Sequence, residues 1–124
     1  MVLDHLGFAV SNYARSKAFY ERALAPLGIS VLMEPAGQAA GFGRDGKPSF
    51  WVEGLGRPVQ GRLHIAFAAD TREQVDAFHA AALDAGGTDN GPPGVREIYH
   101  PSYYGAYVLD PDGNNVEAVC HKPA

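Results

Sequence analysis

The chain has 124 residues, a length that suits one domain with a hydrophobic core of its own. Its 46% hydrophobic and 19% charged residues are typical of a soluble protein, and its net charge of −4 argues against a nucleic-acid partner. The apolar runs are too short for a membrane span, and the start lacks the basic and apolar regions of a signal peptide. A single cysteine, Cys120, excludes an intrachain disulfide. We therefore expect a cytoplasmic domain.

The first half of the chain predicts a strand, a helix and three further strands. Residues Leu3–Val10 alternate as a strand, with His5 and two small residues on one face. Apolar residues then recur at helical spacing from Ala14, and Gly28 ends that helix. Proline and glycine separate the strand candidates Ile29–Met33, Ala39–Gly43 and Ser49–Glu53.

The second half begins in the same way after a linker at Gly54–Gly61. Arg62–Ala69 reads as a strand carrying His64. A helix follows, which Asp70 or Thr71 caps and Gly86-Gly87 ends. The polar, Pro- and Gly-rich segment Thr88–Ser102 reads as a long loop. The chain closes with a hairpin, whose two strands and turn are Tyr103–Leu109, Asn115–Cys120 and Asp110–Asn114.

The two halves align with each other without a gap. Setting Asp4–Gly28 against Leu63–Gly87 pairs His5 with His64 and also matches several Phe, Leu and Gly positions. We infer an α+β domain spanning 1–124, made of two strand–helix–three-strand (βαβββ) modules at 1–56 and 61–124. Each module is small for an independent core, so the two should pack together and share a cleft.

Glu117 lies in the middle of an otherwise apolar strand, where a carboxylate is costly unless it is paired or bound to a metal. Two imidazoles and one carboxylate form a set that leaves open positions on a divalent metal. We therefore predict a metal site of His5, His64 and Glu117, although either histidine alone would be an ordinary hydrogen-bonded core residue. Glu53 ends the corresponding strand of the first module. It is either a fourth ligand or the solvated end of its strand.

Further residues are candidates for contacting a substrate. Tyr107 would face the buried carboxylate across the closing hairpin, and Tyr103 and Tyr104 offer further phenols, although ordinary sheet packing explains all three equally well. Trp51 shares a strand face with Glu53 and is large enough to fill a fourth-ligand position. The long loop adds candidates, because long loops often carry function: Arg96, Tyr99 and His100.

Several stretches together resemble the vicinal oxygen chelate superfamily, the group of glyoxalases, bleomycin-resistance proteins and dioxygenases. The resemblance covers essentially the whole chain and is carried by Asp4–Val10, Ser16–Tyr20, Leu63–Phe67 and Asp110–Asn114 with Glu117. It implies paired βαβββ modules that form a half-barrel around a divalent metal, which is Zn, Ni, Mn or Fe(II). It also implies that His5, His64 and Glu117 are the ligands and that substrates chelate the metal through adjacent oxygens.

The sequence separates the members of this group only in part. Glyoxalase I uses four ligands, and Glu53 is an uncertain match for the missing one. Fosfomycin-resistance transferases carry a tryptophan where Trp51 stands, but they also carry a threonine where Gly7 stands. Extradiol dioxygenases have a tyrosine upstream of the glutamate, as Tyr107 is here, in longer chains. Bleomycin-binding proteins lack the ligands, so the His-His-Glu set argues against pure sequestration.

We therefore expect a glyoxalase-like, metal-dependent enzyme with lyase or isomerase chemistry on a small molecule. Glu117 or Glu53 would act as the base and Tyr107 would assist. The alternatives are an extradiol-type dioxygenase, a thiol transferase and a non-catalytic binder of a small molecule such as an antibiotic. Relatives of this design also suggest a homodimer in which His5 comes from one subunit and His64 with Glu117 from the other.

Overall fold

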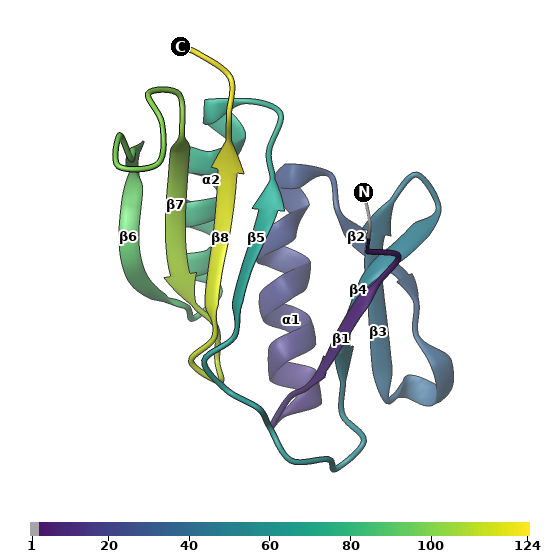
Figure 1. The fold of residues 1–124 in the computed structure, drawn as a ribbon. Helices are drawn as coiled ribbons and strands as arrows, with labels where there is room; N and C mark the ends of the chain where they lie inside the picture. The colour runs from purple at the N-terminus through teal and green to yellow at the C-terminus, as the bar shows by residue number, and fades with distance from the viewer. Residues whose placement is uncertain (1–2) are drawn as a thin grey trace.

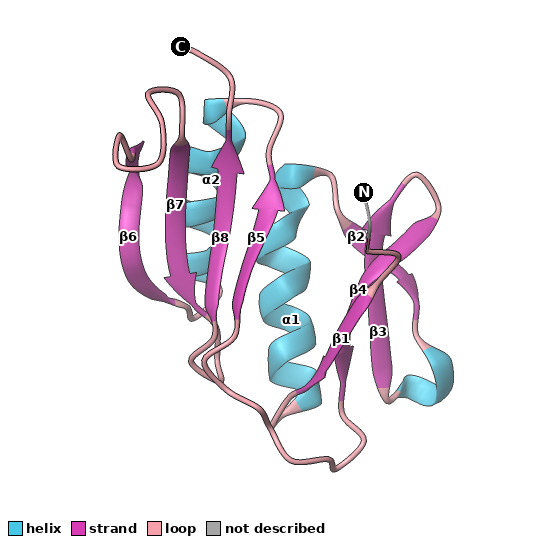
Figure 2. Cartoon of the chain, viewed as in Figure 1, coloured by secondary structure: helices cyan, strands magenta, loops and turns pink. Residues whose placement is uncertain are grey.

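The computed structural model describes residues 3–124, so the first two residues of the expected first module lie outside the described range. Each half contains one α-helix and four strands (Figures 1 and 2). The first module also contains two short 3₁₀ helices. Its elements are β1 (Leu6–Ala9), α1 (Tyr13–Leu24), η1 (Ala25–Leu27), β2 (Ser30–Met33), η2 (Pro35–Gly37), β3 (Ala39–Arg44) and β4 (Lys47–Glu53).

The second module repeats this order. Its elements are β5 (His64–Ala68), α2 (Arg72–Asp84), β6 (Thr88–Val95), β7 (Tyr104–Leu109) and β8 (Asn115–Cys120). Thr71 caps α2 by accepting from the Gln74 backbone N–H at 3.1 Å. No helix within residues 3–124 is long and apolar enough to cross a membrane.

The strand order is the same in both sheets. The first sheet runs β1-β4-β3-β2 and the second runs β5-β8-β7-β6, and in each the first two strands are parallel. The halves are therefore two βαβββ modules, as the repeat indicated. Both sheets stay open rather than closing into a barrel.

The segment that reads as a loop after α2 in fact contains a strand. Thr88–Val95 forms β6, which pairs with β7 at the edge of the second sheet. Its register shifts twice, around Gly91 and before Gly94. An edge strand with bulges tolerates proline and glycine, because few of its N–H groups are needed for pairing. The composition of this segment therefore predicts a loop, although the segment forms a strand.

α1 lies between the two sheets and α2 lies behind the second sheet, so each sheet has a helix on one face (Figure 1). Phe19, Tyr20 and Phe78 are fully or nearly fully buried where the helices meet the strands. The opposite face of the second sheet carries no helix, and Figure 1 shows it turned toward the viewer. This uncovered face is the open face on which the candidate site lies.

The turn at 110–114 also fastens the two modules together. Tyr20 of α1 donates from its hydroxyl to Asp110 at 2.5 Å. Asp110 in turn accepts from the backbone and the side chain of Asn114. Ser11 of the first module donates to Asp112 from both its backbone N–H and its hydroxyl. Residues that predict a tight turn therefore also join the first module to the second.

Candidate functional site

Glu117 is a buried carboxylate on the open face of the second sheet. The residue is only 1% exposed. One carboxylate oxygen, Oε1, lies 2.7 Å from Nε2 of His64, and the other accepts a hydrogen bond from the Tyr103 hydroxyl. Both oxygens therefore have a partner, which is what makes the burial of this carboxylate tolerable.

Strand pairing explains how these side chains meet. Glu117 pairs with Ala66 of β5 on one side and with Tyr107 of β7 on the other. The pairing with Tyr107 is the arrangement that the hairpin predicted. Gly105 leaves room beside them, because a Cβ there would lie 3.3 Å from the carboxylate of Glu117.

Tyr103 lies within a group of aromatic rings. Its ring centroid is 4.7 Å from that of Tyr99, 5.5 Å from that of His100 and 5.2 Å from that of His121. The two histidine rings face each other, with Nε2 of His100 and Nδ1 of His121 2.8 Å apart. Burial, and next the hydrogen bond to Glu117, raises the pKa of Tyr103, so this phenol keeps its proton and remains a donor.

Arg96 and Tyr107 extend the site toward β6. The guanidinium carbon of Arg96 lies 5.2 Å from the centroid of the Tyr107 ring, and the ring of His64 lies 6.4 Å from the same ring. Burial raises the pKa of Tyr107, with a smaller contribution from the charge of Glu117. The three residues predicted from the long segment, Arg96, Tyr99 and His100, therefore all border the Glu117 site.

Two predicted residues, Trp51 and Glu53, lie on the open face of the first sheet. Trp51 packs over Gly41, where a Cβ would lie only 2.7 Å from the indole ring. Glu53 lies over Gly7, and its carboxylate is 3.9 Å from the guanidinium of Arg57. The face of small residues beside His5 is therefore occupied by Trp51 and Glu53.

The register corrects the expected equivalence of Glu53 and Glu117. Gly7 pairs with Trp51, whereas Ala66, its counterpart in the repeat, pairs with Glu117. Trp51 thus occupies the position of Glu117, and Glu53 occupies that of Val119. The sequence placed each glutamate in the last strand of its module, but it could not fix the pairing of those strands.

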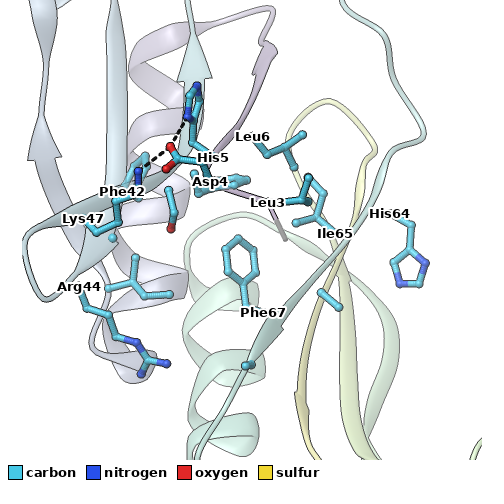
Figure 3. Close-up of a pocket in the computed structure, with 16 residues that line it drawn as sticks. Leu3, Asp4, His5, Leu6, Phe42, Arg44, Lys47, His64, Ile65 and Phe67 are labelled. Atoms are coloured by element: carbon cyan, nitrogen blue, oxygen red, sulfur yellow. Dashed lines mark hydrogen bonds and ion pairs between the residues drawn. The ribbon is translucent and has the colours of Figure 1, made fainter. Parts of the chain in front are cut away.

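His5 does not approach His64 and Glu117 within one chain. Its ring bonds to Asp4 at 2.7 Å, and Figure 3 draws His5 and His64 on different sides of the cleft between the modules. This cleft, about 810 Å³ in volume, is walled mainly by apolar side chains such as Phe42 and Phe67. Within residues 3–124 no three metal-ligating side chains come together.

Tyr104 lies on the opposite face of the second sheet from Glu117. Its hydroxyl donates to Asp76 of α2 at 2.6 Å, and Arg72 lies over its ring. The phenol therefore packs against a helix and is not brought together with the other site residues. Alternation along β7 accounts for this difference, because Tyr103 and Tyr107 point to the face opposite Tyr104.

We compared the chain with known protein families and solved structures. The family model for the Glyoxalase/Bleomycin resistance protein/Dioxygenase superfamily matches residues 2–118. The chain belongs to this superfamily. One solved relative is a glyoxalase/bleomycin resistance protein from Albidiferax ferrireducens, with 32% identity, a TM-score of 0.82 and coverage of 99% of this chain and 100% of that one. A comparison with curated proteins found no match.

More distant superfamily structures share the fold alone. A structure described as lactoylglutathione lyase from Agrobacterium tumefaciens is 17% identical, with a TM-score of 0.68 over 97% of this chain and 92% of that one. TioX from Micromonospora is 16% identical, with a TM-score of 0.71 over 98% and 100%.

Two residues around Glu117, Tyr103 and His121, carry only a weak signal in the sequence. Tyr103 was one of two tyrosines for which the hairpin indicated no partner, yet the alternation of side chains along a strand puts it on the same face as Tyr107. His121 follows the last strand and looks like part of a solvated end. No local pattern connects it with His100.

Proposed function

We propose that the protein is a metal-dependent, glyoxalase-like enzyme that acts on a small molecule with adjacent oxygen atoms. The observation that carries this proposal is Glu117, a buried carboxylate whose Oε1 converges with Nε2 of His64 on an otherwise uncovered sheet face. Two such donors pointing at one place suit a divalent ion of the Zn, Ni, Mn or Fe(II) type.

The donor set fits a metal if a second copy of the chain completes it. His64 and Glu117 supply two ligands from the second sheet. The third would be His5 of another copy, which lies just before β1 and whose side chain is 61% exposed, so it can meet a facing surface. The metal would polarise a carbonyl or enediolate oxygen and stabilise the negative charge that develops there.

The chain's own residues have distinct roles in this proposal. Tyr103 holds one oxygen of Glu117, so the carboxylate keeps a fixed orientation. Glu117 then presents its other oxygen toward the open face, where it would accept a proton from the substrate. Tyr107 lies directly across the strand pair and would donate to a substrate oxygen. Trp51 and Glu53 of the second copy would form the facing wall.

A non-catalytic binding protein is the second candidate. The hydrogen bonds from His64 and Tyr103 already satisfy Glu117 within one chain, so the burial of this carboxylate does not by itself require a metal. In that case the open face would hold a small molecule without changing it.

Metal titration by calorimetry distinguishes the two candidates. The enzyme proposal expects about one ion per chain in the wild type and strongly weakened binding in His64→Ala and Glu117→Ala, because a three-ligand site loses one donor. His79→Ala is the matched control, since His79 bonds to Asp89 on the helix side. Unchanged affinity in His64→Ala, or no metal uptake by the wild type, would refute the metal site and favour the binder.

A further inference from the structure

A hollow beside the Glu117 site is built around Arg96. Its volume is about 330 Å³, and its walls come from β6, β7, β8 and the segment after β6, including Asn90, Arg96, Tyr99 and Tyr107. It is separate from the cleft between the modules. Tyr107 and Asn115 line the hollow on the side nearest the proposed metal ligands. Tyr107 pairs with Glu117 across the strands, and Asn115 pairs with His64.

The Arg96 side chain is held in place by its surroundings. Nη2 donates to the Pro92 carbonyl at 2.7 Å, and the guanidinium lies over the ring of Tyr107. A Cβ on Gly94 would lie 3.0 Å from Nη1, and one on Gly91 would lie 3.2 Å from Nη2. The two glycines at the bulges of β6 therefore make the space in which this guanidinium lies.

The charge of Arg96 is not balanced by an acidic neighbour. Among the described residues no ion pair joins Arg96 to a carboxylate, whereas Arg22 and Arg57 each pair with one. A guanidinium has five N–H donors, and the structure records one hydrogen bond from this one, to Pro92. Arg96 is thus a fixed cation with donors to spare at the wall of a hollow.

We propose that this hollow binds a carboxylate group of the substrate, while the rest of the same molecule reaches His64 and Glu117. This inference rests on the proposed function for the identity of the reacting end. The planar guanidinium matches the two oxygens of a carboxylate. Tyr99 and Tyr107 offer aromatic surface to the apolar part of the molecule. The ring of Tyr107 borders both places, because its centroid lies 5.2 Å from the guanidinium carbon of Arg96 and 6.4 Å from the centroid of His64, so one small acid would reach from one place to the other.

The test uses benzoate and its neutral analogue benzamide on full-length, metal-free protein, followed by NMR of the Gly91 and Asn115 amides. Wild type should prefer benzoate, and Arg96→Gln should bind benzoate about tenfold more weakly, because a charge-assisted hydrogen bond is lost. Gly94→Ala keeps the charge but displaces the guanidinium, so it should also weaken benzoate binding. Arg15→Gln, an exposed arginine on α1, is the control and should change nothing.

The outcomes separate this subsite from the proposed metal site. Equal affinity for benzoate and benzamide, or unchanged benzoate affinity in Arg96→Gln, would overturn the carboxylate subsite. Zinc titration of the same samples is read independently, and Arg96→Gln should retain wild-type zinc affinity. A benzoate preference in a protein that takes up none of Zn, Ni, Mn and Fe(II) would uphold the anion subsite and refute the metal-dependent enzyme.

Discussion

Burying a carboxylate costs free energy unless each oxygen finds a donor, and Glu117 meets that requirement through two side chains. His64 serves one oxygen and remains 57% exposed, so it is available to a ligand. Tyr103 serves the other oxygen from within an aromatic group. Of the two partners, Tyr103 is therefore the structural one and His64 the one suited to binding.

Replacing Tyr103 by phenylalanine should lower the free energy of unfolding by about 1.5–3 kcal/mol, because one oxygen of a buried carboxylate loses its donor. Tyr99→Phe is the matched control. Tyr99 is 62% exposed, so its replacement should cost little. Urea denaturation of both variants checks this, and equal stabilities would show that the Tyr103 hydroxyl is not needed to satisfy Glu117.

Alkaline pH should destabilise the protein through Tyr20, which is buried, and Tyr103, which is partly buried. Burial and neighbouring carboxylates raise the pKa of Tyr20 and Tyr103 above the ordinary value of 10.0. Below that value both states hold the proton, whereas above it the unfolded chain releases the proton and the folded chain keeps it. The free energy of unfolding should therefore fall as the pH rises above about 10, by up to about 1.4 kcal/mol per pH unit for each phenol.

Urea midpoints measured between about pH 9 and about pH 11 test this dependence. The double variant Tyr20→Phe/Tyr103→Phe should lose part of the slope, since two of the shifted phenols are gone. A slope that is the same in wild type and double variant would contradict the assignment.

At the scale of the element, glycines set the shape of both open faces. In the first sheet, Gly41 of β3 lets the ring of Trp51 lie flat on the strand. In the second sheet, Tyr107 occupies the position equivalent to Gly41, because Gly41 pairs with Trp51 and Tyr107 pairs with Glu117. Equivalent strands thus carry an aromatic ring over glycine in one module and a carboxylate facing a phenol in the other.

Gly41→Ala should push the indole of Trp51 off the strand, because the added Cβ would lie 2.7 Å from the ring. Trp51 is the single tryptophan of the chain, so its fluorescence reports this displacement directly. We expect a red-shifted emission and stronger quenching by acrylamide. Gly94→Ala, in the other sheet, is the control. An unchanged spectrum in Gly41→Ala would mean that the strand moves and the ring does not.

Elements with strong periodicity could be predicted from the sequence, and elements held by pairing could not. Both α-helices and seven of the eight strands follow from local pattern. The strand at 88–95 could not be predicted, because its glycines and prolines are typical of turns. It forms a bulged edge strand only because it pairs with β7. Glu117 could be singled out from its place in an apolar strand, and His64 from the repeat; the structure brings the two into contact. The equivalence of Trp51 with Glu117 required the register.

At the scale of the whole molecule, the two open faces carry the residues that the proposed site would combine. The second sheet offers His64 and Glu117, and the first offers His5 and Trp51, yet within one chain these faces do not meet. Exposed apolar side chains also border the cleft between the modules, with Leu3 62% and Leu6 40% exposed. A second copy that placed its first sheet against this second sheet would bring the sets together, as closed two-fold symmetry allows.

Mixing two defective variants tests this homodimer. His5→Ala and Glu117→Ala homodimers should each bind metal weakly, but their heterodimer contains one site with both an intact His5 and an intact Glu117. Random exchange makes half of the dimers heterodimers, so an equimolar mixture should regain about one ion per four chains. Calorimetric zinc titration before and after exchange measures this gain, and dilution of the wild type should release metal as the dimer dissociates. A monomer by light scattering at micromolar concentration that still binds one ion per chain would contradict the shared site.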